Sequence, residues 1–284
     1  MSEPVRTKAN NEKRRGFDLT WILIIVAAAG LAILEIFPPE YSADPVMNGM
    51  ISVIVTRAVG AALFIPLLIR SGFCVLGIGK MPAGPALAAF IPALIVCINN
   101  APIIPLVNGS ASVTAPAYYI VIYAIESLLI GLFEELAFRG VLYLSLLENR
   151  RNSTKQIFWT TVASSALFGC VHLFNLFVGG SPGAVLLQIG YSFLIGGMCS
   201  IVLLRTGCIW LCVLLHGIYD FGGYLVSTLG QGGIWYPLTV TVTAVIGVAA
   251  AVILVLDLLH IRPEDVAPLF PPVSEKDTDV GNEN

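Results

Sequence analysis

Three short groups of polar residues interrupt apolar runs of this chain, and their residue types could do chemistry together. They are the segments 134–139 (Glu-Glu-Leu-Ala-Phe-Arg), 168–172 (Phe-Gly-Cys-Val-His) and 216–220 (His-Gly-Ile-Tyr-Asp). Carboxylates and imidazoles are the side chains that most often transfer protons in enzymes. The first hypothesis is therefore a catalytic site assembled from three separate segments.

Helical spacing divides the roles within the first group. Glu135 and Arg139 are four residues apart with the acid first, which is the favourable order for an ion pair on a helix. Glu134 is rotated by about 100° from this pair. We therefore expect Arg139 to neutralise Glu135 and to leave Glu134 free to take a proton from water. The alternative is that both acids only hold helices together through Arg139.

The second and third groups also have a spacing of four. Phe168 and His172 share a helix face, so the aromatic ring can pack on the imidazole. Asp220 can accept a hydrogen bond from His216 and thereby set the tautomer of its ring. Cysteines precede His216 at the same interval, which leaves a soft-metal site open as an alternative to simple packing: Cys208 and Cys212.

Taken together, these residues predict hydrolysis of a peptide bond without a covalent intermediate. Glu134 and His172 would activate water, and His216 would stabilise the oxyanion. This chemistry requires no cofactor, but a divalent metal such as zinc, held by the same three side chains, is the alternative. The zinc motif His-Glu-x-x-His is absent from the sequence. We expect Phe168 and Tyr219 to line the substrate pocket.

Composition shows what kind of protein must position these residues. Of the 284 residues, 57% are hydrophobic and only 12% are charged, whereas soluble domains have roughly 25% charged residues. A water-soluble globule and a disordered chain are both excluded, which leaves a polytopic membrane protein. The basic residues form only short clusters, so no nucleic-acid partner is predicted.

Apolar runs of about 20 residues, the length needed to cross a bilayer, predict an all-α bundle of eight transmembrane helices. They cover residues 19–37, 51–69, 85–107, 117–147, 156–177, 184–204, 208–228 and 238–261. Prolines interrupt the third run, so we expect it to be kinked or to end early. The fourth run exceeds one bilayer thickness, so it must be tilted, bent or extended into water.

The distribution of lysine and arginine predicts the orientation. With the basic N-terminal tail in the cytoplasm, the loops 38–50, 108–116, 178–183 and 229–237 face outward, and they contain no Lys or Arg. Both termini are then cytoplasmic, in a multi-pass protein of the plasma membrane. The basic start before an apolar run also resembles a signal peptide; we interpret it as a retained anchor.

One transmembrane domain, residues 18–262, accounts for almost the whole chain. Residues 1–17 form a polar, basic cytoplasmic tail, and residues 263–284 are expected to form an acidic, mobile cytoplasmic tail. Within the membrane, Arg57 could pair with Glu35 or Glu126, in either a structural or a functional role.

The depth of the polar groups supports a common site. At about 1.5 Å per residue from the cytoplasmic end of each helix, Glu134, His172, His216 and Asp220 lie roughly 17–26 Å deep. Ionisable side chains are costly at such depth and usually mark a function or a pair. We therefore expect one buried cavity that water can enter.

The three motifs Glu-Glu-x-x-x-Arg, Phe-x-x-x-His and His-x-x-x-Asp, in this order on separate membrane helices, resemble the CAAX protease and bacteriocin-processing family (CPBP, or Abi). This family of intramembrane proteases includes the type II CAAX prenyl endopeptidases, and the resemblance covers about residues 116–228. It implies that Glu134 activates water with support from Glu135 and Arg139. His172 would position the water, and His216 with Asp220 would form the oxyanion pair.

The last motif departs from the family pattern. Prenyl endopeptidases have Asn where this chain has Asp220, and an ionised Asp cannot donate a hydrogen bond. Asp220 must then be protonated, orient His216, or help to bind a metal. The compact loops and their charges suggest a bacterial member, whose substrate would be a peptide precursor or a membrane protein rather than a prenylated protein.

The predicted function is an intramembrane endopeptidase that works in contact with the lipid bilayer. One alternative is a bacteriocin self-immunity factor or another membrane binding protein of the same fold, for which proteolysis is not required. Another is a proton-coupled transporter with Glu134 and His172 as a relay, although the sequence contains no paired broken helices. The oligomeric state is left open.

Overall fold

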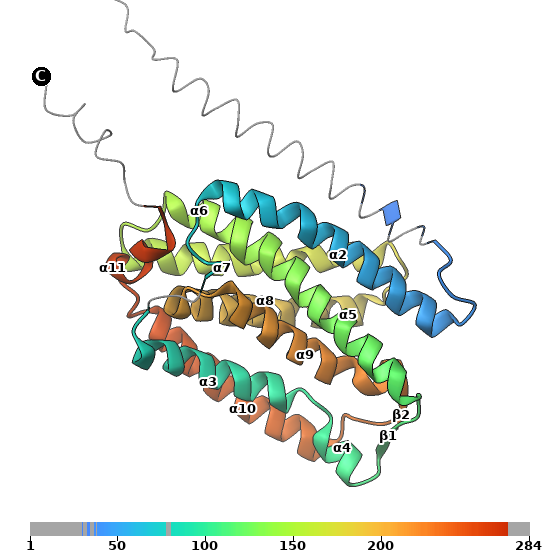
Figure 1. Cartoon of the computed structure of the whole chain (residues 1–284). Coiled ribbons are helices and arrows are strands. Elements are labelled where there is room, and N and C mark those ends of the chain that lie inside the picture. Colours follow the sequence, from blue (N-terminus) through green and yellow to red (C-terminus); the bar gives the residue numbers. More distant parts are fainter. Residues whose placement is uncertain (1–29, 31–32, 35–36, 38, 78–80, 272–284) are drawn as a thin grey trace, which may run out of the picture.

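The computed structural model describes residues 30, 33–34, 37, 39–77 and 81–271. This part of the chain is a bundle of long helices that run roughly side by side (Figure 1). The helices are α2 (Pro45–Ser71), α3 (Ala83–Asn99), α4 (Ile103–Val107), α5 (Ala117–Glu135), the π-helix η1 (Leu136–Tyr143), α6 (Leu144–Glu148), α7 (Thr154–Val171), the 3-10 helix η2 (His172–Leu176), α8 (Pro182–Thr206), α9 (Ile209–Leu229), α10 (Pro237–Leu258), α11 (Pro263–Val266) and the 3-10 helix η3 (Ala267–Leu269).

Helix boundaries follow from local sequence signals. The side chain of Asp44 accepts a hydrogen bond from the backbone N–H of Met47 and caps α2, and the side chain of Ser181 caps α8 in the same way. A proline follows each cap, where its missing N–H costs nothing. Both helices end at a glycine in the left-handed conformation, Gly72 and Gly207.

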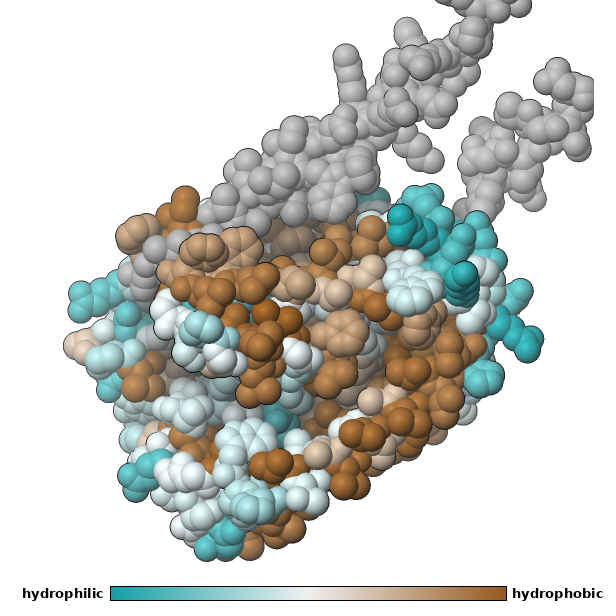
Figure 2. All heavy atoms as spheres, turned by 180° about the vertical axis from the view of Figure 1, so that it is seen from behind, coloured by the Kyte–Doolittle hydropathy of each residue, from teal (hydrophilic) through white to brown (hydrophobic). Residues whose placement is uncertain are grey.

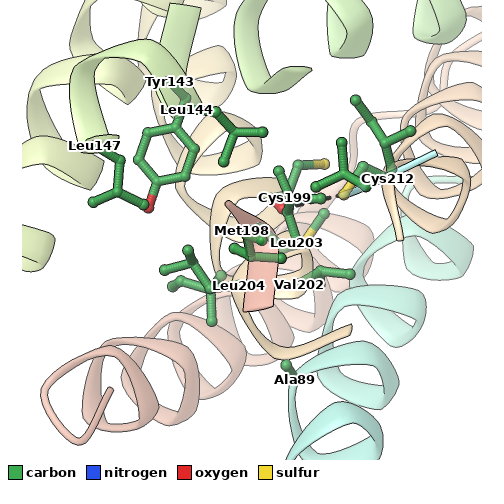
Figure 3. Close-up of a cluster of buried hydrophobic side chains, with 14 of the residues drawn as sticks. Ala89, Tyr143, Leu144, Leu147, Met198, Cys199, Val202, Leu203, Leu204 and Cys212 are labelled. Atoms are coloured by element: carbon green, nitrogen blue, oxygen red, sulfur yellow. Dashed lines mark hydrogen bonds between the residues drawn. The ribbon is translucent and has the colours of Figure 1, made fainter. Parts of the chain in front are cut away.

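Helix α8 lies at the centre of the bundle. It packs against α3, α7, α9 and α10, while α5 packs between α2 and α9. Near the end of α8, Val202, Leu203 and Leu204 are buried on successive faces of the helix, as expected of a helix surrounded by others. Figure 3 shows this cluster, in which the thiol of Cys212 donates a hydrogen bond to the backbone oxygen of Cys199. In this place the cysteines pack as small buried side chains.

The chain is a multi-pass membrane protein. Among the described residues, five helical segments are long and apolar enough to cross a bilayer: Pro45–Ser71, Thr154–Leu176, Pro182–Thr206, Ile209–Leu229 and Pro237–Leu258. Large hydrophobic side chains are exposed along them; Figure 2 shows such side chains across one face and hydrophilic ones toward its two ends. The predicted span 19–37 lies largely outside the described residues, so eight spans and cytoplasmic termini remain predictions.

One predicted irregularity is present, and one that was not predicted accompanies it. The third run is broken: α3 ends at Asn99, and the short α4 follows Pro102. The fourth run continues from α5 through the wider η1 into α6. A π-helical turn inside an α-helix often accompanies a functional site, and this one directly follows Glu135. At the opposite end of α5, the short strands β1 (Ala111–Val113) and β2 (Gly230–Gly232) pair antiparallel.

The expectation of a mobile C-terminal tail is wrong for residues 263–271. Val266, Leu269 and Phe270 are buried, and the Phe270 ring packs edge-on against Phe73 with the ring centres 5.5 Å apart. One of the acidic residues of this segment forms an ion pair: Oδ2 of Asp265 lies 3.2 Å from Nη1 of Arg205. Apolar burial and this ion pair hold the segment against the ends of the long helices.

Candidate active site

Helices α5 and α9 cross at two glycines. A Cβ atom on Gly131 would lie 2.9 Å from the backbone oxygen of Val213 and 3.0 Å from the backbone nitrogen of Gly217. A Cβ atom on Gly217 would lie 2.9 Å from Leu128. These distances are shorter than ordinary contacts, so small residues are what allow the two backbones to approach. The crossing places the end of α5, with its two glutamates, beside the middle of α9.

A buried acid, base and cation meet at this crossing. The Oε1 atom of Glu135 lies 2.6 Å from Nδ1 of His216 and 3.0 Å from Nη1 of Arg139. The side chains of Glu135 and Arg139 are at most 1% exposed. A carboxylate paired with Arg139 is an acceptor, so Nδ1 of His216 is the donor. This assignment directs the second ring nitrogen, Nε2, toward the remaining acids.

Two further carboxylates face Nε2 of His216. The Nε2 atom lies 3.4 Å from Oδ2 of Asp220 and 3.6 Å from Oε2 of Glu134. Both acidic side chains are 15% exposed, in contrast to the buried Glu135. The expected ion pair between Glu135 and Arg139 is present, and Glu134 lies outside it. The sequence suggested Asp220 as the group that orients the histidine, but the shortest contact of the ring is with Glu135.

Phe168 is the aromatic centre of the site. Its ring lies edge-on to both imidazoles, with ring centres 5.6 Å from His172 and 5.9 Å from His216. The guanidinium of Arg139 stands 4.1 Å over the same ring, a distance typical of a cation–π contact. Behind the ring, a Cβ atom on Gly196 would come within 3.1 Å of both Phe168 and Arg139. Phe168 therefore packs the three motifs against one another.

His172 lies at the end of a helix, whereas the sequence predicts it inside one. The predicted span 156–177 makes it an interior helical residue, but α7 ends at Val171 and His172 opens the 3-10 helix η2. The chain has to reverse before α8 begins, and it does so through Gly179 at a φ of 94°. The contact between His172 and Phe168 nevertheless survives, because it spans only the last turn.

A cavity of about 680 Å³ opens in front of these groups. Most of the candidate residues line it: Glu134, Phe168, His172, His216, Tyr219 and Asp220. Glu135 and Arg139 do not, because they lie behind the imidazole. Aromatic residues form much of the remaining wall, including Phe133, Phe138 and Phe174. The arrangement presents two carboxylates and two imidazoles to a molecule in a largely apolar pocket.

Several lining residues were not singled out as site residues in the sequence. Arg57 from α2 lines the cavity, and its guanidinium stands 5.3 Å from the ring centre of Phe133. Glu126 interacts electrostatically with it, whereas Glu35 lies outside the described residues. Tyr191 and Tyr224 also line the cavity. For Tyr224 a signal existed, since it stands one helical turn after Asp220.

The metal alternative has no matching cluster in the described part of the chain. There, no group of three or more His, Cys, Asp or Glu side chains is placed to hold a metal ion. In the suggested ligand set, Nε2 of His216 and Oε2 of Glu134 are 3.6 Å apart. Cys208, which precedes the first residue of α9, and Cys212 on α9 are buried in the core and do not line the cavity.

Residues 116–222 match the family model described as type II CAAX prenyl endopeptidase, Rce1-like. The resemblance to the CAAX protease family is confirmed. The matched segment contains all three motifs and the helices that carry them, from the beginning of α5 into α9. No curated protein and no solved structure matches the chain.

Proposed function

We propose that this protein is an intramembrane endopeptidase of the plasma membrane that hydrolyses a peptide bond with water activated by Glu134. The observation that carries the proposal is the difference between two adjacent carboxylates. Glu135 is fully buried between Arg139 and His216, whereas Glu134 faces the cavity. A general base has to reach the water whose proton it accepts, and only Glu134 of the two meets this condition.

The reaction follows from these positions. Glu134 takes a proton from water while the water oxygen bonds to the substrate carbonyl carbon, whose π electrons move to the oxygen. With both ring nitrogens protonated, His216 donates from Nδ1 to Glu135 and directs the N–H of Nε2 toward the region where this charge develops. His172 lines the same cavity and positions the water. When the carbon–nitrogen bond breaks, the protonated Glu134 gives its proton to the leaving amine.

The pocket supports a peptide substrate with apolar side chains. Its walls contain several phenylalanines, and the polar groups converge at Glu134, His216 and Asp220. A pocket of this kind buries apolar groups and orients them through few polar contacts. Because Asp220 stands where prenyl endopeptidases carry Asn, we propose a peptide precursor or a membrane protein as the substrate rather than a prenylated one.

Replacement of Glu134 tests the proposal. The purified protein in detergent micelles is screened with a library of internally quenched peptides, and kcat is measured on the peptides that it cleaves. Glu134→Gln should lower kcat on the order of 10³-fold. Glu126→Gln is the matched control, since it makes the same change on the same helix at a position that does not line the cavity. Full activity of Glu134→Gln would exclude the proposed base.

The metal alternative is tested on the same preparation. Water activated by a carboxylate needs no metal, so cleavage should persist after dialysis against a chelator, and elemental analysis should find no stoichiometric metal. Loss of activity that zinc restores would instead favour a zinc ion held by Glu134, His172 and His216.

A further inference from the structure

A pair of tyrosines in the cavity wall has no part in the proposed reaction. The hydroxyls of Tyr191 on α8 and Tyr224 on α9 form a hydrogen bond with each other. Both residues line the cavity that contains Glu134 and His216. The ring of Tyr191 also packs against Tyr219, with the ring centres 6.3 Å apart. The pair is thus held in the wall by contacts from two helices.

One hydroxyl proton of this tyrosine pair is available to a ligand. Each phenol has one O–H group, and one hydrogen bond between them uses only one of the two protons. Within the described residues, neither hydroxyl has a further hydrogen-bond partner. Whichever tyrosine accepts in the pair therefore keeps an O–H group that can donate to a ligand in the cavity.

The proposed reaction has His216 as its donor to the oxyanion but lacks a neutral one. Nε2 of His216 is shared between two carboxylate oxygens, at 3.4 Å and 3.6 Å. Asp220, when ionised, can only accept hydrogen bonds. Tyr224 lies four residues after Asp220 and so occupies the neighbouring position on the same face of α9. A neutral donor placed there would meet the carbonyl oxygen without adding another negative charge.

We propose that Tyr191 and Tyr224 together donate a hydrogen bond to the carbonyl oxygen that becomes the oxyanion. The inference rests on the proposed function and adds a second donor beside His216. No proton is transferred in this step, because the O–H group only stabilises the oxygen while Glu134 carries the proton. A donor already bound to another hydroxyl is polarised by it, which strengthens the bond that it gives.

A purely structural role makes different predictions. If the pair only joined α8 to α9, its loss would lower the melting temperature or widen the pocket and raise KM. A donor to the oxyanion acts in the transition state alone, so its loss lowers kcat and leaves KM unchanged. The two roles are therefore separable by kinetics and by stability.

The test uses Tyr191→Phe, Tyr224→Phe and the double variant in the full chain. The probes are a quenched peptide that the wild type cleaves and a peptide phosphonamidate, which resembles the tetrahedral intermediate. The double variant should lose kcat on the order of 10²-fold with KM unchanged, and should bind the phosphonamidate more weakly by a similar factor. Tyr143→Phe is the matched control, since its hydroxyl is bonded to Thr161 in the core, away from the cavity.

The outcomes distinguish this inference from the proposed function. Unchanged kcat in the double variant, with Glu134→Gln inactive, would overturn the tyrosine donor alone. A raised KM with a lower melting temperature and unchanged kcat would also overturn it, in favour of a structural pair. Absence of cleavage by the wild type, or full activity of Glu134→Gln, would overturn both.

Discussion

The crossing of α5 and α9 gives a sharp prediction, because a single methyl group at Gly131 must separate the proposed catalytic groups. In Gly131→Ala the new Cβ atom would lie 2.9 Å from the backbone oxygen of Val213 and 3.3 Å from Cβ of His216. Ordinary contacts begin at 3.4 Å, and packed interiors have little free space to absorb the difference. Helix α9 therefore has to move by about 0.5 Å.

The shift of α9 would lengthen the shortest polar contact of the site. A shift of about 0.5 Å would lengthen the 2.6 Å contact between Glu135 and Nδ1 of His216 to the outer limit of a hydrogen bond. Misplacement by 1 Å can cost about 10²-fold in rate, so we expect kcat to fall roughly 10-fold. The effect on stability should be smaller, because the overpacking, about 1–3 kcal/mol, is partly offset by the higher helix propensity of alanine, about 1 kcal/mol.

Peptide cleavage and thermal unfolding are measured together on Gly131→Ala and on Gly247→Ala. The second variant is the control: Gly247 lies in the membrane helix α10, where a Cβ atom would meet nothing within 4 Å. The control should keep its kcat and its melting temperature. If Gly131→Ala cleaves at the wild-type rate while it remains folded, the close crossing does not set the geometry of the site.

Three further substitutions test other contacts. Arg139→Met leaves Glu135 buried without its cation, which costs about 3–5 kcal/mol, so the melting temperature should fall on the order of 10 °C; an unchanged value would show that the ion pair is dispensable. Phe270→Ala removes a ring from the packed C-terminal segment and should lower the melting temperature while kcat, measured on the folded protein, stays unchanged. Asp220→Asn keeps an acceptor for His216 and adds a donor, so cleavage should be retained; a loss as large as that of Glu134→Gln would show that the charge of Asp220 is required.

Relations within one helix could be read from the sequence. The pairs Glu135–Arg139 and Phe168–His172 are four residues apart, and helical geometry alone brings such side chains together. Both contacts are present in the structure. The apolar runs likewise predicted the long helices, because burial in lipid requires a length that few other structures need.

Contacts between helices could not be read in this way. Glu135 and His216 are 81 residues apart, and no local pattern states which helix faces which. The spacing of four residues predicts only the pairing of Glu135 with Arg139. A carboxylate has lone pairs for several donors, so the imidazole can bind to the same oxygen as the guanidinium.

The packing of residues 263–271 could not be predicted for a different reason. Its prolines and acids are typical of a solvated tail, and its few apolar residues are too short a run to have a period. The burial of Phe270 depends on Phe73 and on the cation of Arg151, whose Cζ atom is 4.0 Å from the ring centre. Such partners are known only once the ends of the long helices have been placed.

The proposed reaction changes the charge of the site, and the positions of two adjacent glutamates and one histidine explain how the site would keep its shape. A helix turns by about 100° per residue, so Glu135 points to the buried arginine while Glu134 points to the cavity. The imidazole ring of His216 separates them, with Nδ1 toward Glu135 and Nε2 toward Glu134. The buried contact, at 2.6 Å, holds the ring, whereas the contact with Glu134, at 3.6 Å, is longer than a hydrogen bond. In the proposed reaction, the charge that changes is therefore on the acid that contributes least to fixing the geometry.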